Sequence, residues 1–268
     1  MASSRLFLGI DPSGGRHPFL YAALDEQRAL LTLAAGDLQD VLTFLERFPQ
    51  AIVAVNAPLR PNVGQARRRL RPPDNSAGPS PRGLDLRLAE ADLRARGISI
   101  AATPSREDAC PPWMRAGFDL YRRLQTLGFH PYRPDHPQPD APRLWIETHP
   151  HACFCVLIGH LPLPKPTLEG RLQRQAVLYE LGLPIDDPMD FFEEITLRRL
   201  RLGQLPMEHL TPPEHLDVLV AAYTAWLLSH HPEQTTCLGS AEEGWIVLPA
   251  RELKPSYLPA GSSAALDR

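Results

Sequence analysis

Acidic and amide side chains stand where apolar segments of this sequence end. Asp11, Asn56 and Glu147 each close a short apolar run of the kind that forms a buried strand. Asp217 lies inside an almost wholly apolar segment, where a charge must face solvent or a polar site because burying it unpaired is costly. In open α/β sheets, ligands bind at the carboxyl ends of the parallel strands. We therefore expect these four side chains to share one cleft.

Three carboxylates in one cleft would repel one another. At about 4 Å and an effective dielectric near 20, each like-charged pair costs about 4 kcal/mol. A divalent cation relieves this cost, which predicts Mg²⁺ or Mn²⁺ bound by Asp11, Glu147 and Asp217, with the amide oxygen of Asn56 as a further ligand. Two such ions about 3.5–4 Å apart would activate a water for phosphodiester hydrolysis. Taken singly, each acid fits a turn, a strand end or a solvated helix; the set of three favours a site.

The elements that must position these residues begin with three strands, a helix and a fourth strand. Their apolar patterns cover residues 5–10, 19–24, 29–34, 37–48 and 51–55. The first three runs follow one another closely and predict an antiparallel meander. Asp37 is the expected N-cap of the helix. Because this helix is a crossover connection, the strand after it should lie parallel to the first strand.

The rest of the chain alternates helical patterns, strands and proline-rich loops. Helices are predicted over 84–96, 113–127, 167–181, 191–202 and 214–228, and strands over 143–147 and 244–248. Thr211 is the expected N-cap of the last helix, with Glu214 completing a capping box. We interpret residues 1–268 as a single α/β domain, with a proline-rich loop and a helical insertion around residues 61–142.

The composition of the chain indicates where the protein is located and which classes of partner it can bind. A net charge of −3 provides no overall basic surface, so a nucleic-acid partner would need a local patch, such as the arginine-rich run 67–71. The four cysteines form no CxxC pair and no secretory signal precedes them, which predicts reduced thiols and a cytoplasmic location. No apolar run has the length of a membrane helix, so no membrane partner is expected. The oligomeric state is left open.

Several short segments, taken in order, resemble a known prokaryotic family. They are Gly9-Ile10-Asp11, the segments 54–59 and 146–150, Lys165 followed by Arg171 and Arg174, and the segment 217–222. Their order and spacing are similar to the family called domain of unknown function 429, often described as predicted ribonuclease H-like nucleases. The resemblance implies a ribonuclease H-like fold with a mixed central sheet and a divalent-metal nuclease activity. Asn56 departs from the aspartate that the family typically has there, which implies weaker cation binding.

Four further residues are candidates for binding the substrate. Lys165, Arg171 and Arg174 could contact a phosphate or a carboxylate, although arginines at this spacing also suit a solvated helix face. His149 could orient a ligand, shuttle a proton or simply cap the strand end. Glu90 is expected to be solvated.

Two alternatives to a nuclease stay open. A ribonuclease H-like binding protein with impaired catalysis is consistent with Asn56. An ATP-binding protein of the actin or sugar-kinase type shares the three-strand start, with Ser13-Gly14-Gly15 as a phosphate-binding turn. The alternation of His and Cys over residues 149–155 would also form a zinc face if this segment were a strand.

Overall fold

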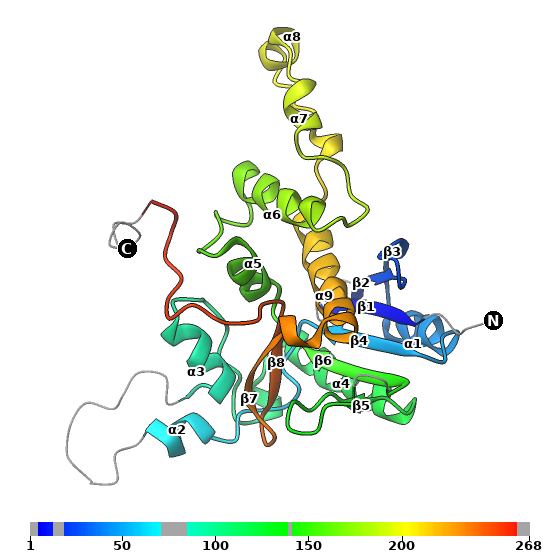
Figure 1. The fold of residues 1–268 in the computed structure, drawn as a ribbon, viewed down its shortest axis with the longest axis vertical. Coiled ribbons are helices and arrows are strands. Elements are labelled where there is room, and N and C mark those ends of the chain that lie inside the picture. The colour runs from blue at the N-terminus through cyan, green and yellow to red at the C-terminus, as the bar shows by residue number, and fades with distance from the viewer. Residues whose placement is uncertain (1–4, 13–18, 71–84, 139–140, 262–268) are drawn as a thin grey trace.

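An eight-stranded mixed sheet forms the centre of the fold in this computed structural model, which describes residues 5–12, 19–70, 85–138 and 141–261 (Figure 1). The strands are β1 (Leu6–Asp11), β2 (Phe19–Leu24), β3 (Leu30–Gly36), β4 (Ala51–Val55), β5 (His130–Pro131), β6 (Arg143–Glu147), β7 (Thr236–Ser240) and β8 (Gly244–Leu248). They are ordered β3-β2-β1-β4-β6-β8-β7, with β5 beside β6. Strands β1, β4, β6 and β8 are parallel, whereas β2, β3 and β7 are antiparallel to their neighbours.

Helices cover both faces of the sheet. They are α1 (Leu38–Glu46), α2 (Gln65–Leu70), α3 (Leu88–Ala95), α4 (Pro112–Thr126), α5 (Pro150–Ile158), α6 (Leu168–Glu180), α7 (Asp190–Glu193), α8 (Leu197–Arg201) and α9 (Pro213–His230). Three short 3₁₀ turns complete the described elements: η1 (Glu107–Ala109), η2 (Met207–His209) and η3 (Pro232–Gln234). Among the described residues, no helix combines the length and the apolarity needed to cross a membrane.

The central strands are apolar on both faces, as buried parallel strands must be. Alternate residues of β1 face opposite ways: Phe7 packs in the core that contains α9, and Leu8 packs in the core that contains α1 and α4. Helix α9 lies against β1, β2 and β4. This packing brings the start of α9 close to the carboxyl ends of β1 and β4.

Gly9 sets how closely α9 approaches β1. A Cβ at this position would lie 2.0 Å from the carbonyl oxygen of Val218 and 2.5 Å from the amide nitrogen of Ala222. No side chain fits in this space, so the helix backbone rests directly on the strand. Asp217 immediately precedes Val218, and Asp11 follows Gly9 by two residues. The close contact therefore also holds the two aspartates near each other.

Gly9→Ala is expected to lower the free energy of unfolding by about 3 kcal/mol, because the helix must move away from the strand. Urea denaturation measures this change. Gly203→Ala is the control: its Cβ would meet nothing within 4 Å, and only its φ of +66° opposes the substitution, at about 1 kcal/mol. Equal losses in the two variants would contradict the tight packing at Gly9.

Many of the predicted elements are confirmed, including the β-β-β-α-β start. Asp37 is the N-cap of α1, and its carboxylate accepts a hydrogen bond from the amide of Asp40. The prediction of one helix over 191–202 is wrong, since α7 ends at Glu193 and α8 begins after Thr196, whose hydroxyl caps it. Helix α2 lies in the segment predicted as a loop.

Two further predictions are wrong at helix starts. Residues 149–155 are not a strand: Pro150 occupies the first turn of α5 and the imidazole of His149 caps it, which removes the zinc face. Pro212, rather than Thr211, is the N-cap of α9, with no capping side chain. Both errors arise because a proline begins the helix, since the fixed φ of proline suits the first turn.

Candidate functional site

A cleft of about 320 Å³ opens at the edge where the parallel strands β1, β4 and β6 end. Asp11, Asn56 and Glu147 line it as predicted, together with His149, whereas Asp217, which was expected in the same cleft, does not line it. Apolar side chains form much of the remaining wall: Ile100, Trp113, Met114 and Ile246. An apolar cleft with a few convergent polar groups is the usual form of a small-molecule site.

Asp11 is the acid at the centre of this edge. One of its carboxylate oxygens accepts a hydrogen bond from the side-chain amide of Asn56, at 3.2 Å. Burial and, to a smaller extent, the negative charge of Asp217 raise the pKa of Asp11 to about 6, while Lys165 opposes the shift. The two aspartates therefore interact electrostatically, although 206 positions separate them in the chain.

Asp217 approaches Asp11 from α9 and is almost completely buried. Its carboxylate accepts a hydrogen bond from the ammonium group of Lys165 at 2.5 Å. Burial raises the pKa of Asp217, whereas Lys165 and Arg174 lower it. The charges of Lys165 and Arg174 thus already partly neutralise this acid pair. Neither Asp217 nor Lys165 lines the 320 Å³ cleft, so this pair lies beside the cleft rather than in its wall.

Glu147 lies in the cleft wall, but its carboxylate oxygens are already engaged. The guanidinium of Arg87 donates to both of them, one through Nη2 and the other through Nη1 at 2.9 Å. The backbone amide of Leu59 donates to the second oxygen at 2.8 Å. Both side chains of the ion pair are at most 4% exposed. The structure therefore brings Asp11, Asn56 and Asp217 together and holds Glu147 in an ion pair.

Arg87 is the centre of a buried polar network that the sequence did not reveal. Its Nε also donates to Glu90 at 2.8 Å, and the hydroxyl of Thr103 donates to the same carboxylate. Glu90 is 1% exposed, so the expectation of a solvated residue is wrong. Glu243, also buried, accepts hydrogen bonds from three backbone amides, including that of Leu88 at 2.8 Å. This network fixes one wall of the cleft.

Both arginines predicted to bind substrate donate hydrogen bonds to backbone carbonyl groups; Arg174 is buried, whereas Arg171 is partly exposed. Arg174 is 2% exposed, and its Nη1 donates to the carbonyl oxygens of Leu163 at 2.9 Å and Gly170 at 2.7 Å. Arg171 donates to the carbonyl oxygen of Thr211 at 2.7 Å. The bond to Leu163 anchors the loop that carries Lys165.

His149 lines the cleft and caps α5. Its Nδ1 accepts a hydrogen bond from the amide of Ala152 at 3.2 Å. Burial lowers the pKa of His149 to about 3, so the ring is neutral near pH 7. With Nδ1 accepting, Nε2 carries the proton and is the donor that the ring can offer. A capping role is therefore shown, and a role in binding substrate stays a prediction.

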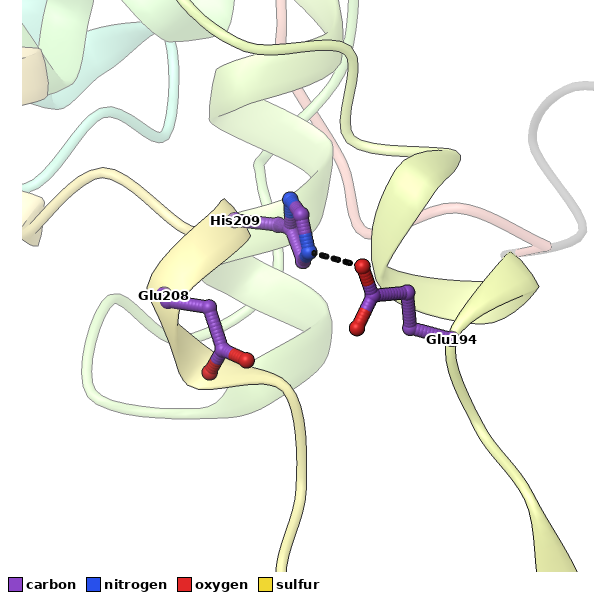
Figure 2. A group of neighbouring side chains, drawn as sticks. All are labelled: Glu194, Glu208 and His209. Carbon is purple, nitrogen blue, oxygen red and sulfur yellow. Dashed lines mark ion pairs between the residues drawn. The ribbon is translucent and has the colours of Figure 1, made fainter.

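A separate group of potential metal ligands lies far along the chain from the cleft residues. Among the described residues, only Glu194, Glu208 and His209 form a set of three in which all ligand atoms lie within 4.8 Å of one another. Figure 2 shows His209 pointing toward Glu194, and the two side chains form an ion pair at 3.1 Å. Arg199 contacts both carboxylates, at 3.1 and 3.4 Å. The guanidinium of Arg199 therefore already neutralises part of the negative charge of these two carboxylates.

Comparison with known proteins gives one family. The family described as "Protein of unknown function (DUF429)" matches residues 9–243, which include Asp11, Asn56, Glu147 and Asp217. Searches of curated proteins and of solved structures found no match. The match covers most of the chain, and the chain therefore belongs to the DUF429 family.

Proposed function

We propose that this chain has a ribonuclease H-like fold and hydrolyses phosphodiester bonds with a divalent cation bound by Asp11 and Asp217. One observation carries the proposal: a half-buried carboxylate from β1 and a buried one from α9 converge, so that the charge of Asp217 raises the pKa of Asp11. The β-β-β-α-β order and the parallel pairing of β1 with β4 support the fold assignment. The DUF429 membership is consistent with both parts.

The donor set suits one Mg²⁺ or Mn²⁺ better than two. Two carboxylates and the side-chain oxygen of Asn56 are hard oxygen donors of the kind that these ions prefer. The amide nitrogen of Asn56 donates to Asp11, which leaves the amide oxygen free to act as a ligand. Glu147, the third acid predicted to bind metal, is paired with Arg87, so it contributes to positioning the site rather than to a second ion.

The residues of the chain would share the chemistry as follows. When bound, the cation would activate a water and stabilise the charge on the phosphate oxygens. Asp11, whose pKa is about 6 without the cation, would bind the cation as the carboxylate, so cation affinity should fall as the pH drops below 6. Lys165 stands at the acid pair and offers its ammonium group to a phosphate oxygen. The buried network of Arg87 and Glu147 keeps the cleft wall rigid.

A nucleic-acid substrate stays part of this proposal. The arginine-rich run was its main local support, and in the structure Arg67 pairs with Asp85 and Arg68 with Glu242. Arg71 lies outside the described residues. Partial neutralisation of this run, together with an apolar cleft, favours a short single strand or a small phosphodiester over a long duplex.

The proposal is tested by incubating the protein with labelled single-stranded DNA and RNA and with bis(p-nitrophenyl) phosphate. Hydrolysis is expected with Mn²⁺ or Mg²⁺ and is expected to stop with EDTA. Asp217→Asn should remove it, whereas Asp92→Asn, a change of the same type at a partly exposed surface ion pair, should not. Cleavage that persists in Asp217→Asn would place the chemistry elsewhere.

A binding protein with impaired catalysis is the second candidate. It is favoured by two observations: Asn56 brings no charge, and the oxygens of Glu147 are occupied by Arg87 and Leu59. The alternative of an ATP-binding protein depends on Ser13-Gly14-Gly15, which lie outside the described residues. Titration of the protein with ATP in a calorimeter distinguishes that alternative from the other two.

Asn56→Asp is expected to tighten Mn²⁺ binding by about tenfold or more, because it places a third negative charge beside Asp11. Without the ion, the same charge should lower the melting temperature above pH 6, where Asp11 is ionised. Calorimetric titration and thermal denaturation measure the two effects. Unchanged ion affinity would show that position 56 does not face the cation.

A further inference from the structure

A short helical projection between α6 and α9 carries more than half of the large hydrophobic side chains that are exposed among the described residues. Figure 1 shows α7 and α8 extending from α6 away from the sheet. We call residues 187–210 the arm. Of the twelve large hydrophobic side chains exposed among the described residues, seven lie in the arm: Met189, Phe192, Leu197, Leu200, Leu202, Leu205 and Met207. Leu197 is 66% exposed and Met189 is 57% exposed.

The arm is held by ion pairs together with a few buried apolar side chains, among them Phe191. Glu194 after α7 pairs with His209 of η2 (Figure 2). Arg199 of α8 joins Glu194 to Glu208. Phe191 is buried, whereas its neighbour Phe192 is half exposed. The ion pairs therefore hold the arm folded with its leucines outside. Monomeric soluble proteins rarely expose apolar patches larger than a few hundred Å², and larger ones usually mark an interaction surface.

The charges of the arm indicate what covers it. Asp190 and Glu193 of α7 are exposed acids, and Arg198 and Arg201 of α8 are exposed bases. Within the part of the chain that the structure describes, none of these four side chains forms an ion pair. One short surface thus offers both signs of charge on neighbouring helices. An isologous dimer requires such self-complementarity, because the same patch meets itself across a two-fold axis.

We propose that the arm is the surface through which two copies of this chain form a dimer. Two arms related by a two-fold axis would bury their leucines against each other and set the acids of each α7 against the arginines of the other α8. An anionic lipid surface would attract α8 and repel α7, and it would leave the acids without partners. A second copy of the chain would bury the apolar side chains and would also provide a partner of opposite charge for both the acids and the arginines.

Sedimentation equilibrium of the 268-residue chain over a series of concentrations tests the proposal. The unaltered protein is expected to approach twice the chain mass of 29.9 kDa. The double variant Leu197→Glu/Leu200→Glu is expected to sediment as a single chain at the same concentrations. Leu31→Glu is the matched control, since Leu31 is 48% exposed on β3 and should leave the dimer unchanged. Circular dichroism verifies that each variant is folded.

A charge exchange tests the arrangement of the helices. Arg198→Glu/Arg201→Glu should weaken the dimer by about tenfold or more, because acids would then face acids. Adding Asp190→Lys and Glu193→Lys restores opposite charges across the two-fold axis and should restore dimerisation. A single-chain mass for the unaltered protein at every concentration would overturn the proposal, as would dissociation by Leu31→Glu. A charge exchange without rescue would equally overturn the pairing of α7 with α8.

Discussion

Asp11→Asn is expected to reduce divalent-cation-dependent hydrolysis by at least about 100-fold while making the folded protein more stable above pH 6. Asparagine has the shape of aspartate and can still accept the hydrogen bond from Asn56. It carries no charge, so it cannot bind the cation as a carboxylate does. Activity is measured with Mn²⁺ and a labelled oligonucleotide, and stability by urea denaturation.

The stability change should depend on pH in a definite way. The pKa of Asp11 is raised from 3.8 to about 6 on folding, so the folded state binds this proton more tightly than the unfolded state. The associated stability is present below pH 4 and is lost as the pH rises through 6. At pH 8 the variant should therefore gain up to about 3 kcal/mol over the parent, and at pH 3 nothing. An equal gain at both pH values would contradict a buried, repelled carboxylate at position 11.

Arg87→Met is expected to lower the free energy of unfolding by about 3–5 kcal/mol. The substitution leaves Glu147 and Glu90 buried without their cation. Arg122→Met is the control, because Arg122 pairs with Glu107 and Asp119 at the surface, where an ion pair contributes less than about 1 kcal/mol. Chemical denaturation of both variants gives the comparison.

The double variant Arg87→Met/Glu147→Met separates charge pairing from packing. Removing both partners of the ion pair should recover part of the stability that Arg87→Met loses, since Glu147 is then no longer an unpaired buried charge. Losses that simply add would show that the two side chains do not depend on each other. Wild-type stability in Arg87→Met would contradict the buried network altogether.

Local signals predicted the parts of the site that lie at strand ends. Asp11 and Asn56 follow continuous apolar runs, and such runs form central parallel strands because both faces are buried. Strands β2 and β3 and helix α1 lie between these two strands in the chain, and the crossover through α1 makes β4 parallel to β1, so that their carboxyl ends lie at the same edge. Asp217 was predictable in a different way, because an acid within an apolar helix needs a polar partner. Lys165 is that partner.

The ion pair of Arg87 with Glu147 could not be predicted from local pattern. Sixty positions separate the two residues, and periodicity carries no information about contacts at that distance. Glu90 looked like one more charge on a charged helix, and only the tertiary position of α3 shows that it is buried. The break in the helix predicted over 191–202 depended on Thr196, whose hydroxyl caps α8 in place of continuing the helix.

The central claim is that Asp11 and Asp217 bind the same cation, and calorimetric titration with Mn²⁺ tests it most directly. The parent protein, Asp11→Asn and Asp217→Asn are titrated under the same conditions, with Asp92→Asn as the surface control. We expect one Mn²⁺ per chain in the parent and the control, and no measurable binding in either of the other variants. Binding of Mn²⁺ with unchanged affinity in Asp11→Asn would contradict the claim.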